Sequence, residues 1–323
     1  MAPYFGEGGR VTVGDVHYLE RAGARVPVGD TEYAADPAFG YHASNLREWV
    51  AEKYAAAGLG SPVMTSLSLQ VVRGGGPAAV ADALERLPAA GVAVANAEVD
   101  RDIEVVALGG LIAEEAGVPV IARTAASYVR ARAGRRPMPL LTAAELQTDG
   151  PGLIVVGSHV DTTTRQVRRL LDVRGDRITV EELAVDRLTA GGAEAWAAID
   201  RAAATLEAAL RSGRIGLVAT ERTRREVDLT GGRAVSGALA AIVDRVEHRP
   251  AWVIAKGGIT SSDVASVALG MREARVAGQI LRGVPVWVGG ADTRWPGMPL
   301  VVFPGNVGDD ASLLGAVEKL VRT

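Results

Sequence analysis

The sequence predicts an α/β protein of two domains, each a mostly parallel sheet flanked by helices. The chain has 323 residues, more than one compact domain usually contains. Nearly half of the residues, 48%, are hydrophobic, which is enough for two cores. Short β-branched runs that end in Gly, Ser or Asn alternate with longer Ala/Leu/Arg stretches of helical period, and this alternation is typical of parallel strands joined by crossover helices.

The apolar runs and the helical stretches give the expected elements in order. The expected strands cover residues 63–72, 92–96, 118–122, 153–157, 215–219, 252–256, 284–288 and 300–303. The expected helices cover residues 77–87, 103–116, 162–171, 193–212, 233–247 and 263–274. Before them, the first 55 residues contain GGRVTVGDVHYLERAGARVPVGD, which predicts a small antiparallel β-hairpin with glycine-rich turns.

The stretch GRRPMPLLTAAELQTDGPG predicts a connection between the two domains. It has two prolines near its start and Gly-Pro-Gly near its end, which is the punctuation expected of a linker. We expect the boundary near Asp149, which gives domains 1–149 and 150–323.

Composition narrows the classes of function. A net charge of -3 gives no basic surface for a phosphate backbone, so we expect no nucleic-acid partner. The absence of cysteine excludes disulfides and thiolate metal sites, and four scattered histidines form no H-E-x-x-H, so we expect no protein-bound metal. No segment has the length and apolarity of a membrane span, and we expect a cytoplasmic protein without a membrane partner.

Three predicted strand ends in the second half of the chain are candidate ligand-binding segments. The first is LIVV followed by Gly157, Ser158 and His159, with a helix expected to begin near Asp161 or Thr162. Free backbone N–H groups and the helix dipole at such a place favour an anion. The alternative is that Ser158 and Asp161 only cap the helix.

The second strand end is WVIAK followed by Gly257 and Gly258, then the hydroxyl-bearing run 260–262. Paired glycines let a backbone approach a phosphate or an adenine closely. This segment is not a Walker A sequence, and the chain contains no G-x-G-x-x-G. An ordinary turn with a Ser or Asp cap is the alternative.

The third strand end is LVVF followed by PGNVGDD at residues 304–310. A glycine-rich, acidic loop again precedes a helix, and the alternative is a turn capped by Asp309 or Asp310.

These segments in this order resemble the four-carbon acid sugar kinase family. The likeness lies in VVGSHVDTTTRQV, KGGITSSD, GQILRGVPVWV and FPGNVGD. It implies an ATP-dependent kinase, with Mg²⁺, that phosphorylates threonate, erythronate or 3-oxo-tetronate on its terminal hydroxyl. The residues that it assigns to ATP are Ser158, Gly257, Gly258, Ile259, Thr260 and Gly305.

The first half resembles the later part of the family's sugar-binding domain. The likeness runs from APYFGEGGRVTVGDVHYL through VPVGDTEYAADPAFGYHASNLREWV to ANAEVDRDI and RTAASYV. The polar groups that it offers to the sugar acid are Asp30, Thr31, Asp36 and Arg123. The family's Asp-Asp-x-Thr-Gly and Ser-Thr-x-Arg-Gly segments do not occur in the sequence, so the domain is expected to be partial and no catalytic residue is assigned.

Three hypotheses follow. The first is a kinase for a small-molecule sugar acid. The second is a catalytically silent nucleotide-binding fragment or paralogue that needs a separately encoded N-terminal piece, with a homo-oligomer as a further option. The third is an α/β dehydrogenase, which the lack of a glycine-rich first turn followed by a ribose-binding acid disfavours.

Overall fold

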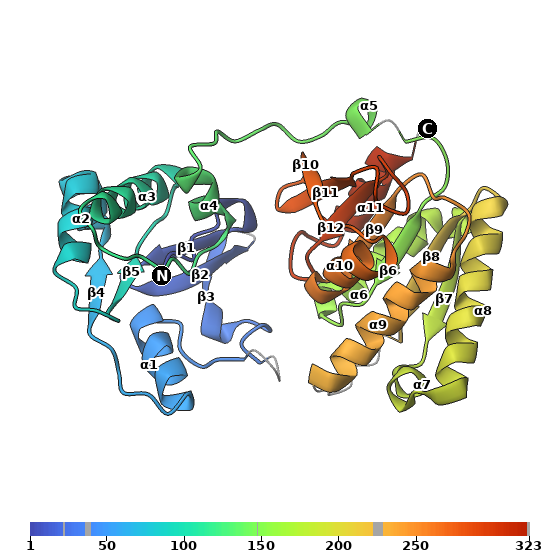
Figure 1. Cartoon of the computed structure of the whole chain (residues 1–323), viewed down its shortest axis with the longest axis horizontal. Coiled ribbons are helices and arrows are strands. Elements are labelled where there is room, and N and C mark those ends of the chain that lie inside the picture. Colours follow the sequence, from blue (N-terminus) through green and yellow to red (C-terminus); the bar gives the residue numbers. More distant parts are fainter. Residues whose placement is uncertain (22, 36–39, 147, 222–228, 322–323) are drawn as a thin grey trace. The chain divides into compact units, whose positions relative to one another are not determined.

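The computed structural model describes residues 1–21, 23–35, 40–146, 148–221 and 229–321. The chain forms two compact units, Met1–Pro137 and Met138–Thr323 (Figure 1). The division falls before the boundary expected near Asp149. Residues after Pro137 belong with the second unit because the Leu141 N–H donates to the Gln279 carbonyl at 2.8 Å, and the Thr148 hydroxyl donates to the Leu320 carbonyl.

A three-stranded antiparallel sheet opens the first unit. Its strands are β1 (Arg10–Val13), β2 (Val16–Arg21) and β3 (Ala24–Pro27), in that order. Gly14 and Asp15 form the turn between β1 and β2, with φ values of +59° and +64°. Two successive positive φ angles define the turn whose twist suits a two-residue hairpin. The antiparallel hairpin expected in the first 55 residues is therefore present.

The rest of the first unit is a parallel strand pair with helices. Strand β4 (Met64–Leu67) pairs with β5 (Val92–Ala95). Helices α2 (Gly76–Glu85), α3 (Asp100–Glu115) and α4 (Ala126–Arg132) pack with this pair, and helix α1 (Leu46–Ala56) begins at Asn45. The Asn45 side chain accepts hydrogen bonds from the N–H groups of residues 47 and 48, which is the usual way a polar side chain caps a helix.

Two strand predictions in the first unit need correction. Residues 118–122 belong to no strand in the described part of the chain, and the Ile121 side chain there is 98% exposed. Pro119 lacks the N–H that a central strand needs. The strand expected over 63–72 ends at Leu67, and the chain then turns helically at η3 (Val71–Gly75).

The second unit is built on a seven-stranded sheet of order β10-β11-β12-β9-β6-β8-β7. The last five strands in this order run parallel, while the β10–β11 hairpin joins β12 antiparallel. The parallel strands are β12 (Pro299–Phe303), β9 (Val253–Lys256), β6 (Leu153–Val156), β8 (Ile215–Thr220) and β7 (Ile178–Leu183). The hairpin consists of β10 (Ala274–Leu281) and β11 (Val284–Gly289).

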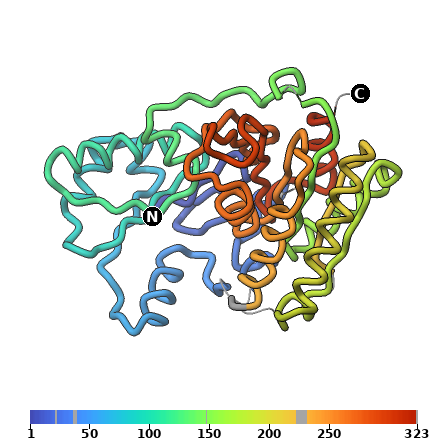
Figure 2. Tube along the Cα trace, turned by 45° about the vertical axis from the view of Figure 1, so that its right-hand side comes forward, coloured from blue at the N-terminus to red at the C-terminus, as the bar shows by residue number. Residues whose placement is uncertain are grey.

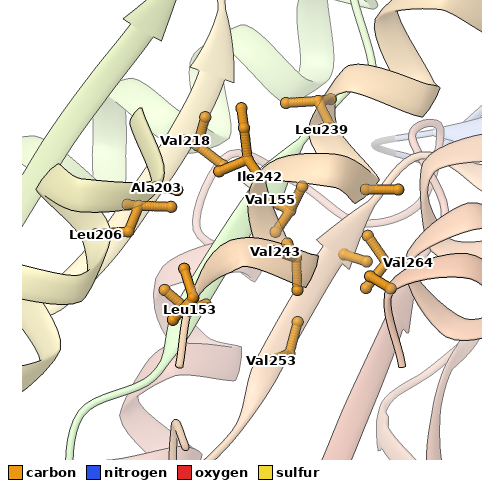
Figure 3. Packing of buried hydrophobic residues seen from close by; sticks show 14 of the residues in the cluster. Leu153, Val155, Ala203, Leu206, Val218, Leu239, Ile242, Val243, Val253 and Val264 are labelled. Atoms are coloured by element: carbon orange, nitrogen blue, oxygen red, sulfur yellow. The ribbon is translucent and has the colours of Figure 1, made fainter. Parts of the chain in front are cut away.

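Helices cover both faces of this sheet. One face packs against α7 (Val185–Ala190), α8 (Gly192–Arg211) and α9 (Leu229–Arg245). Figure 3 shows Leu153, Val155, Val218 and Val253 beside residues of α8 and α9. The other face packs against α6 (Asp161–Arg174) and α11 (Ser312–Leu320). Figure 2 follows the chain through both helical layers. Strand residues are buried on both sides, as parallel sheets require.

The helix after β9 differs from its prediction. The chain turns into α10 (Gly258–Asp263) directly after Gly257 and continues through η5 (Val264–Ala268). Residues 263–274 are therefore not one helix, because Gly270 takes a positive φ of +63° and β10 begins at Ala274. No helix within the described residues is long and apolar enough to cross a bilayer.

Candidate nucleotide site

Three turns leave the carboxyl edge of the second unit's sheet side by side. Val156 of β6 lies opposite Lys256 of β9, and Lys256 lies opposite Phe303 of β12. The chain runs from β8 on one side of β6 to β9 on the other, so β6 marks a switch in strand order. Ligands of open parallel sheets collect at such a place. We call the three turns, residues 157–160, 257–260 and 304–308, the glycine rim.

Gly157 and Gly257 bring the first two turns together. The N–H groups of Gly157 and Ser158 donate to the Lys256 carbonyl at 3.0 and 3.2 Å. A side chain on Gly157 would overlap the Thr260 hydroxyl, so only glycine fits there. Gly257 has a φ of +126°, a conformation that residues with a side chain rarely adopt. Glycine is thus required at both positions for the turns to meet.

Ser158, Thr163 and Gly305 bring in the third turn. The buried Thr163 hydroxyl donates to the Gly305 carbonyl at 3.1 Å and lies 3.1 Å from the Ser158 hydroxyl. A side chain on Gly305 would overlap the Ser158 hydroxyl. The loop after β12 is therefore fixed against the loop after β6.

Two further side chains hold the loop after β12. The buried Gln166 amide donates to the carbonyls of Val307 and Asp309, at 3.1 and 2.8 Å. The ammonium group of buried Lys256 donates to the Pro304 carbonyl at 3.1 Å and lies 3.9 Å from the centre of the Phe303 ring. Sequence reasoning assigned no role to either residue, because their function depends on a loop far away in the sequence.

The helix starts at the glycine rim bear on the capping interpretation. Within the described part of the chain, no side chain caps α6, whose cap position is Val160, or α10, whose cap position is Gly257. The cap position of α6 is thus Val160, and neither Ser158 nor Asp161 occupies it. Uncapped N–H groups are the donors that bind anions at helix starts. At the third turn, Asp309 does accept from the Ala311 N–H and the Ser312 hydroxyl.

The residues expected to bind ATP meet at this rim. Ser158 lies next to both Gly257 and Gly305, and Thr260 lies next to Gly257. Gly258 follows Gly257 directly and has open space where a side chain would stand. Ile259 lies in the same turn, but its side chain is 51% exposed and stands away from the core.

The expected sugar-acid residues are not gathered at one place. Asp30 is exposed at the turn η2 (Val28–Asp30), and the Thr31 hydroxyl donates to the Val28 carbonyl at 2.7 Å. Arg123 lies over the Trp49 ring and lines a cavity whose lining includes neither Asp30 nor Thr31. Asp36 lies outside the described residues.

A polar cluster at the carboxyl ends of β4 and β5 was missed. The Asp15 carboxylate accepts from the Ser66 hydroxyl at 2.6 Å and from the Asn96 amide at 2.7 Å, while the Asp15 N–H donates to Asn96 at 2.8 Å. These bonds fasten the β1–β2 turn to the parallel strands. The signal in the sequence was Gly14-Asp15 between alternating strands and an Asn directly after an apolar run.

Comparisons with known proteins agree with the two-unit architecture. A sugar-binding N-terminal domain model matches residues 1–132, and a nucleotide-binding C-terminal domain model matches residues 153–313. A solved putative tRNA synthase from Salmonella typhimurium LT2 aligns with a TM-score of 0.63 at 18% identity, over 98% of this chain and 72% of that one. A solved Haemophilus influenzae protein of family DUF1537 aligns with a TM-score of 0.57 at 18% identity. The alignment covers 99% of this chain and 73% of that one. No curated protein matches the chain.

The two domain models together cover nearly the whole chain, and the solved structures share its fold. The chain belongs to the DUF1537 family, the four-carbon acid sugar kinase family. Its second unit is the family's nucleotide-binding domain and its first unit is the sugar-binding domain. Within the described residues, no group of three or more His, Cys, Asp or Glu side chains is placed to hold a metal ion.

Proposed function

We propose that the protein is an ATP-dependent kinase that phosphorylates the terminal hydroxyl of a four-carbon sugar acid such as threonate, erythronate or 3-oxo-tetronate. The observation that carries the proposal is the glycine rim. Its turns after β6 and β12 meet through Ser158, Thr163 and Gly305, and its turns after β6 and β9 meet through Gly157 and Thr260. The match to a nucleotide-binding domain over the same residues supports it.

In this proposal the rim holds the ATP phosphates. The uncapped N–H groups at the starts of α6 and α10 donate to phosphate oxygens, with the Ser158 and Thr260 hydroxyls beside them. Gly257 and Gly258 let the nucleotide approach the backbone, and Gly305 does the same on the β12 side. Ile259 contributes its apolar side chain from the same turn. Mg²⁺ is carried mainly by the phosphates and water, the usual arrangement for this ion.

The chemistry is a transfer of the γ-phosphoryl group. The acceptor hydroxyl oxygen forms the new bond to phosphorus, the bond to the bridging oxygen breaks, ADP leaves, and the hydroxyl proton is released. Enzymes speed this reaction chiefly by positioning the groups and by neutralising charge. Fixed N–H donors at two helix starts are suited to that task, since their positions do not change during the reaction.

The first unit supplies the acid site in this proposal, as its match to a sugar-binding domain supports. Asp30 and Thr31 provide polar groups near the surface for substrate hydroxyls. Arg123 was expected to contact the acid as well. Its place on an apolar cavity suits another kind of anion, and we reassign it below.

The test is ADP release from ATP and Mg²⁺ with a panel of threonate, erythronate and 3-oxo-tetronate stereoisomers. We expect turnover with at least one of them, and loss of ATP binding in Gly258→Val, which places a branched side chain in the open space at the rim. ATP binding without ADP release for any acid would contradict the kinase and favour a nucleotide-binding module that acts with a partner chain. NAD(H) binding in place of ATP would favour a dehydrogenase.

A further inference from the structure

The first unit contains a cavity of about 620 Å³, far from the glycine rim in sequence and formed entirely by residues of Met1–Pro137. Helix α1, strand β5 and the extended residues 117–124 contribute to its walls. This volume lies in the range of small-molecule sites, about 300–1,000 Å³. Most of the lining is apolar and includes Val50, Leu84, Val92 and Val106.

One wall of the cavity carries two cations on a single aromatic ring. The guanidinium of Arg123 lies 4.5 Å from the centre of the Trp49 ring, and the ammonium of Lys53 lies 5.6 Å from it. Cation–π attraction of this kind orients the charged groups without neutralising them. The contact with the ring therefore does not neutralise the charge of either group.

Arg123 is the cation without a countercharge. Lys53 donates to Glu52 at 3.0 Å and to the Gly40 carbonyl at 2.8 Å. Among the described residues no carboxylate forms an ion pair with Arg123, although Glu85 also lines the cavity. Met1 lines the cavity as well.

We propose that this cavity is a binding site for a small organic anion with an apolar body. The anionic group, a carboxylate, sulfonate or phosphate, pairs with Arg123, and the body lies against Trp49 and the apolar wall. Charge-assisted hydrogen bonds to a guanidinium are stronger than those between neutral groups. This site is independent of the rim and of the proposed kinase activity.

A four-carbon sugar acid does not suit this cavity. Each of its carbons carries a polar group that needs a hydrogen-bond partner, and a mostly apolar lining leaves such groups unpaired. The acid would also fill only a small part of the volume. The ligand of this cavity is accordingly larger and less polar than a tetronate.

Two dyes that differ in charge test the proposal on the full-length protein. Anilinonaphthalene sulfonate has an apolar body with an anionic group, and phenylnaphthylamine has the same rings without the charge. Fluorescence titration should show tighter binding of the sulfonate. Arg123→Gln should weaken the sulfonate about tenfold, the loss of one charged hydrogen bond, and leave the neutral dye unchanged. Arg123→Lys should restore part of the affinity, and Arg135→Gln, at another exposed arginine, should change neither dye.

A second variant tests the cavity itself. Val120→Phe places a larger side chain in the lining and should weaken both dyes, with the fold checked by circular dichroism. An excess of erythronate should displace neither dye. Unchanged sulfonate binding in Arg123→Gln, unchanged binding of both dyes in Val120→Phe, or displacement by erythronate would each overturn the proposal. Failure of the ADP-release assay would leave it standing.

Discussion

The Ser158 hydroxyl occupies the space that a side chain on Gly305 would need. The two residues belong to loops after different strands, β6 and β12, which are separated in the sheet by β9. Thr163 touches both, through the Ser158 hydroxyl and the Gly305 carbonyl. The loops after β6 and β12 are therefore packed against each other, and changes at this contact should alter ligand binding.

Gly305→Ala should weaken ATP binding about tenfold, because the new methyl group pushes the Ser158 hydroxyl away from the phosphates. The loss of one hydrogen bond to a charged group has an effect of about this size. Isothermal titration calorimetry measures it. The matched control is Gly315→Ala in α11, where open space surrounds the position and alanine is the better helix former. Equal ATP affinity in the two variants would show that Ser158 does not contribute.

Thr163→Val should destabilise the second unit by about 1–2 kcal/mol, since it removes a buried hydroxyl and leaves the Gly305 carbonyl without this donor. Urea unfolding gives the free energy. Thr164→Val, one residue further and only partly buried, is the control and should be close to neutral. A loss of similar size in both variants would assign the effect to the helix and not to the rim.

Asn96→Ala should lower the unfolding free energy of the first unit by about 3 kcal/mol, since the Asp15 carboxylate and its N–H both lose a buried partner. The first thermal transition should move to lower temperature. Exposed Ser61→Ala should leave it in place. A transition that does not move would mean that the Asp15–Asn96 bonds add no net stability.

The stability of the first unit should fall as the pH is lowered from 7 to 5. Burial, and then the charge of Arg10, lower the pKa of His17 to about 4 from an ordinary value of 6.5. Between these values the unfolded chain binds a proton that the folded chain does not, so acid favours unfolding. The expected loss at pH 5 is about 2 kcal/mol, at 1.36 kcal/mol for each pKa unit.

Urea unfolding at pH 7 and pH 5 measures this dependence. His17→Gln should flatten it, whereas His42→Gln, at a side chain that is 99% exposed, should not. A wild-type chain whose stability is equal at both pH values would contradict the buried neutral state of His17.

Strands β6, β8, β9 and β12 were predictable because they are buried on both faces and appear in the sequence as continuous apolar runs. The glycines that follow β6, β9 and β12 were also visible. Strand β7, ITVEEL, was missed because it lies at the sheet edge, where only its end residues Ile178 and Leu183 are buried. The segment 118–122 gave the opposite error, since its apolar run satisfies the strand pattern without a neighbouring strand to pair with.

Contacts between side chains and residues far away in the chain could not be predicted from the sequence. Lys256 and Gln166 have no pattern that reveals their contacts with the loop after β12. Likewise, nothing in the sequence places Arg123 over Trp49, because the cavity they share exists only after α1 and residues 117–124 have folded around it. The glycine motifs were thus predictable from the sequence, whereas the other contacts of the site depend on tertiary packing.

The most direct test of nucleotide binding at the glycine rim is a crystal structure of the protein with ADP and Mg²⁺. We expect phosphates within hydrogen-bond distance of the N–H groups that begin α6 and α10, with the Ser158 and Thr260 hydroxyls at the same phosphates. Nucleotide bound away from the turns after β6, β9 and β12 would contradict it.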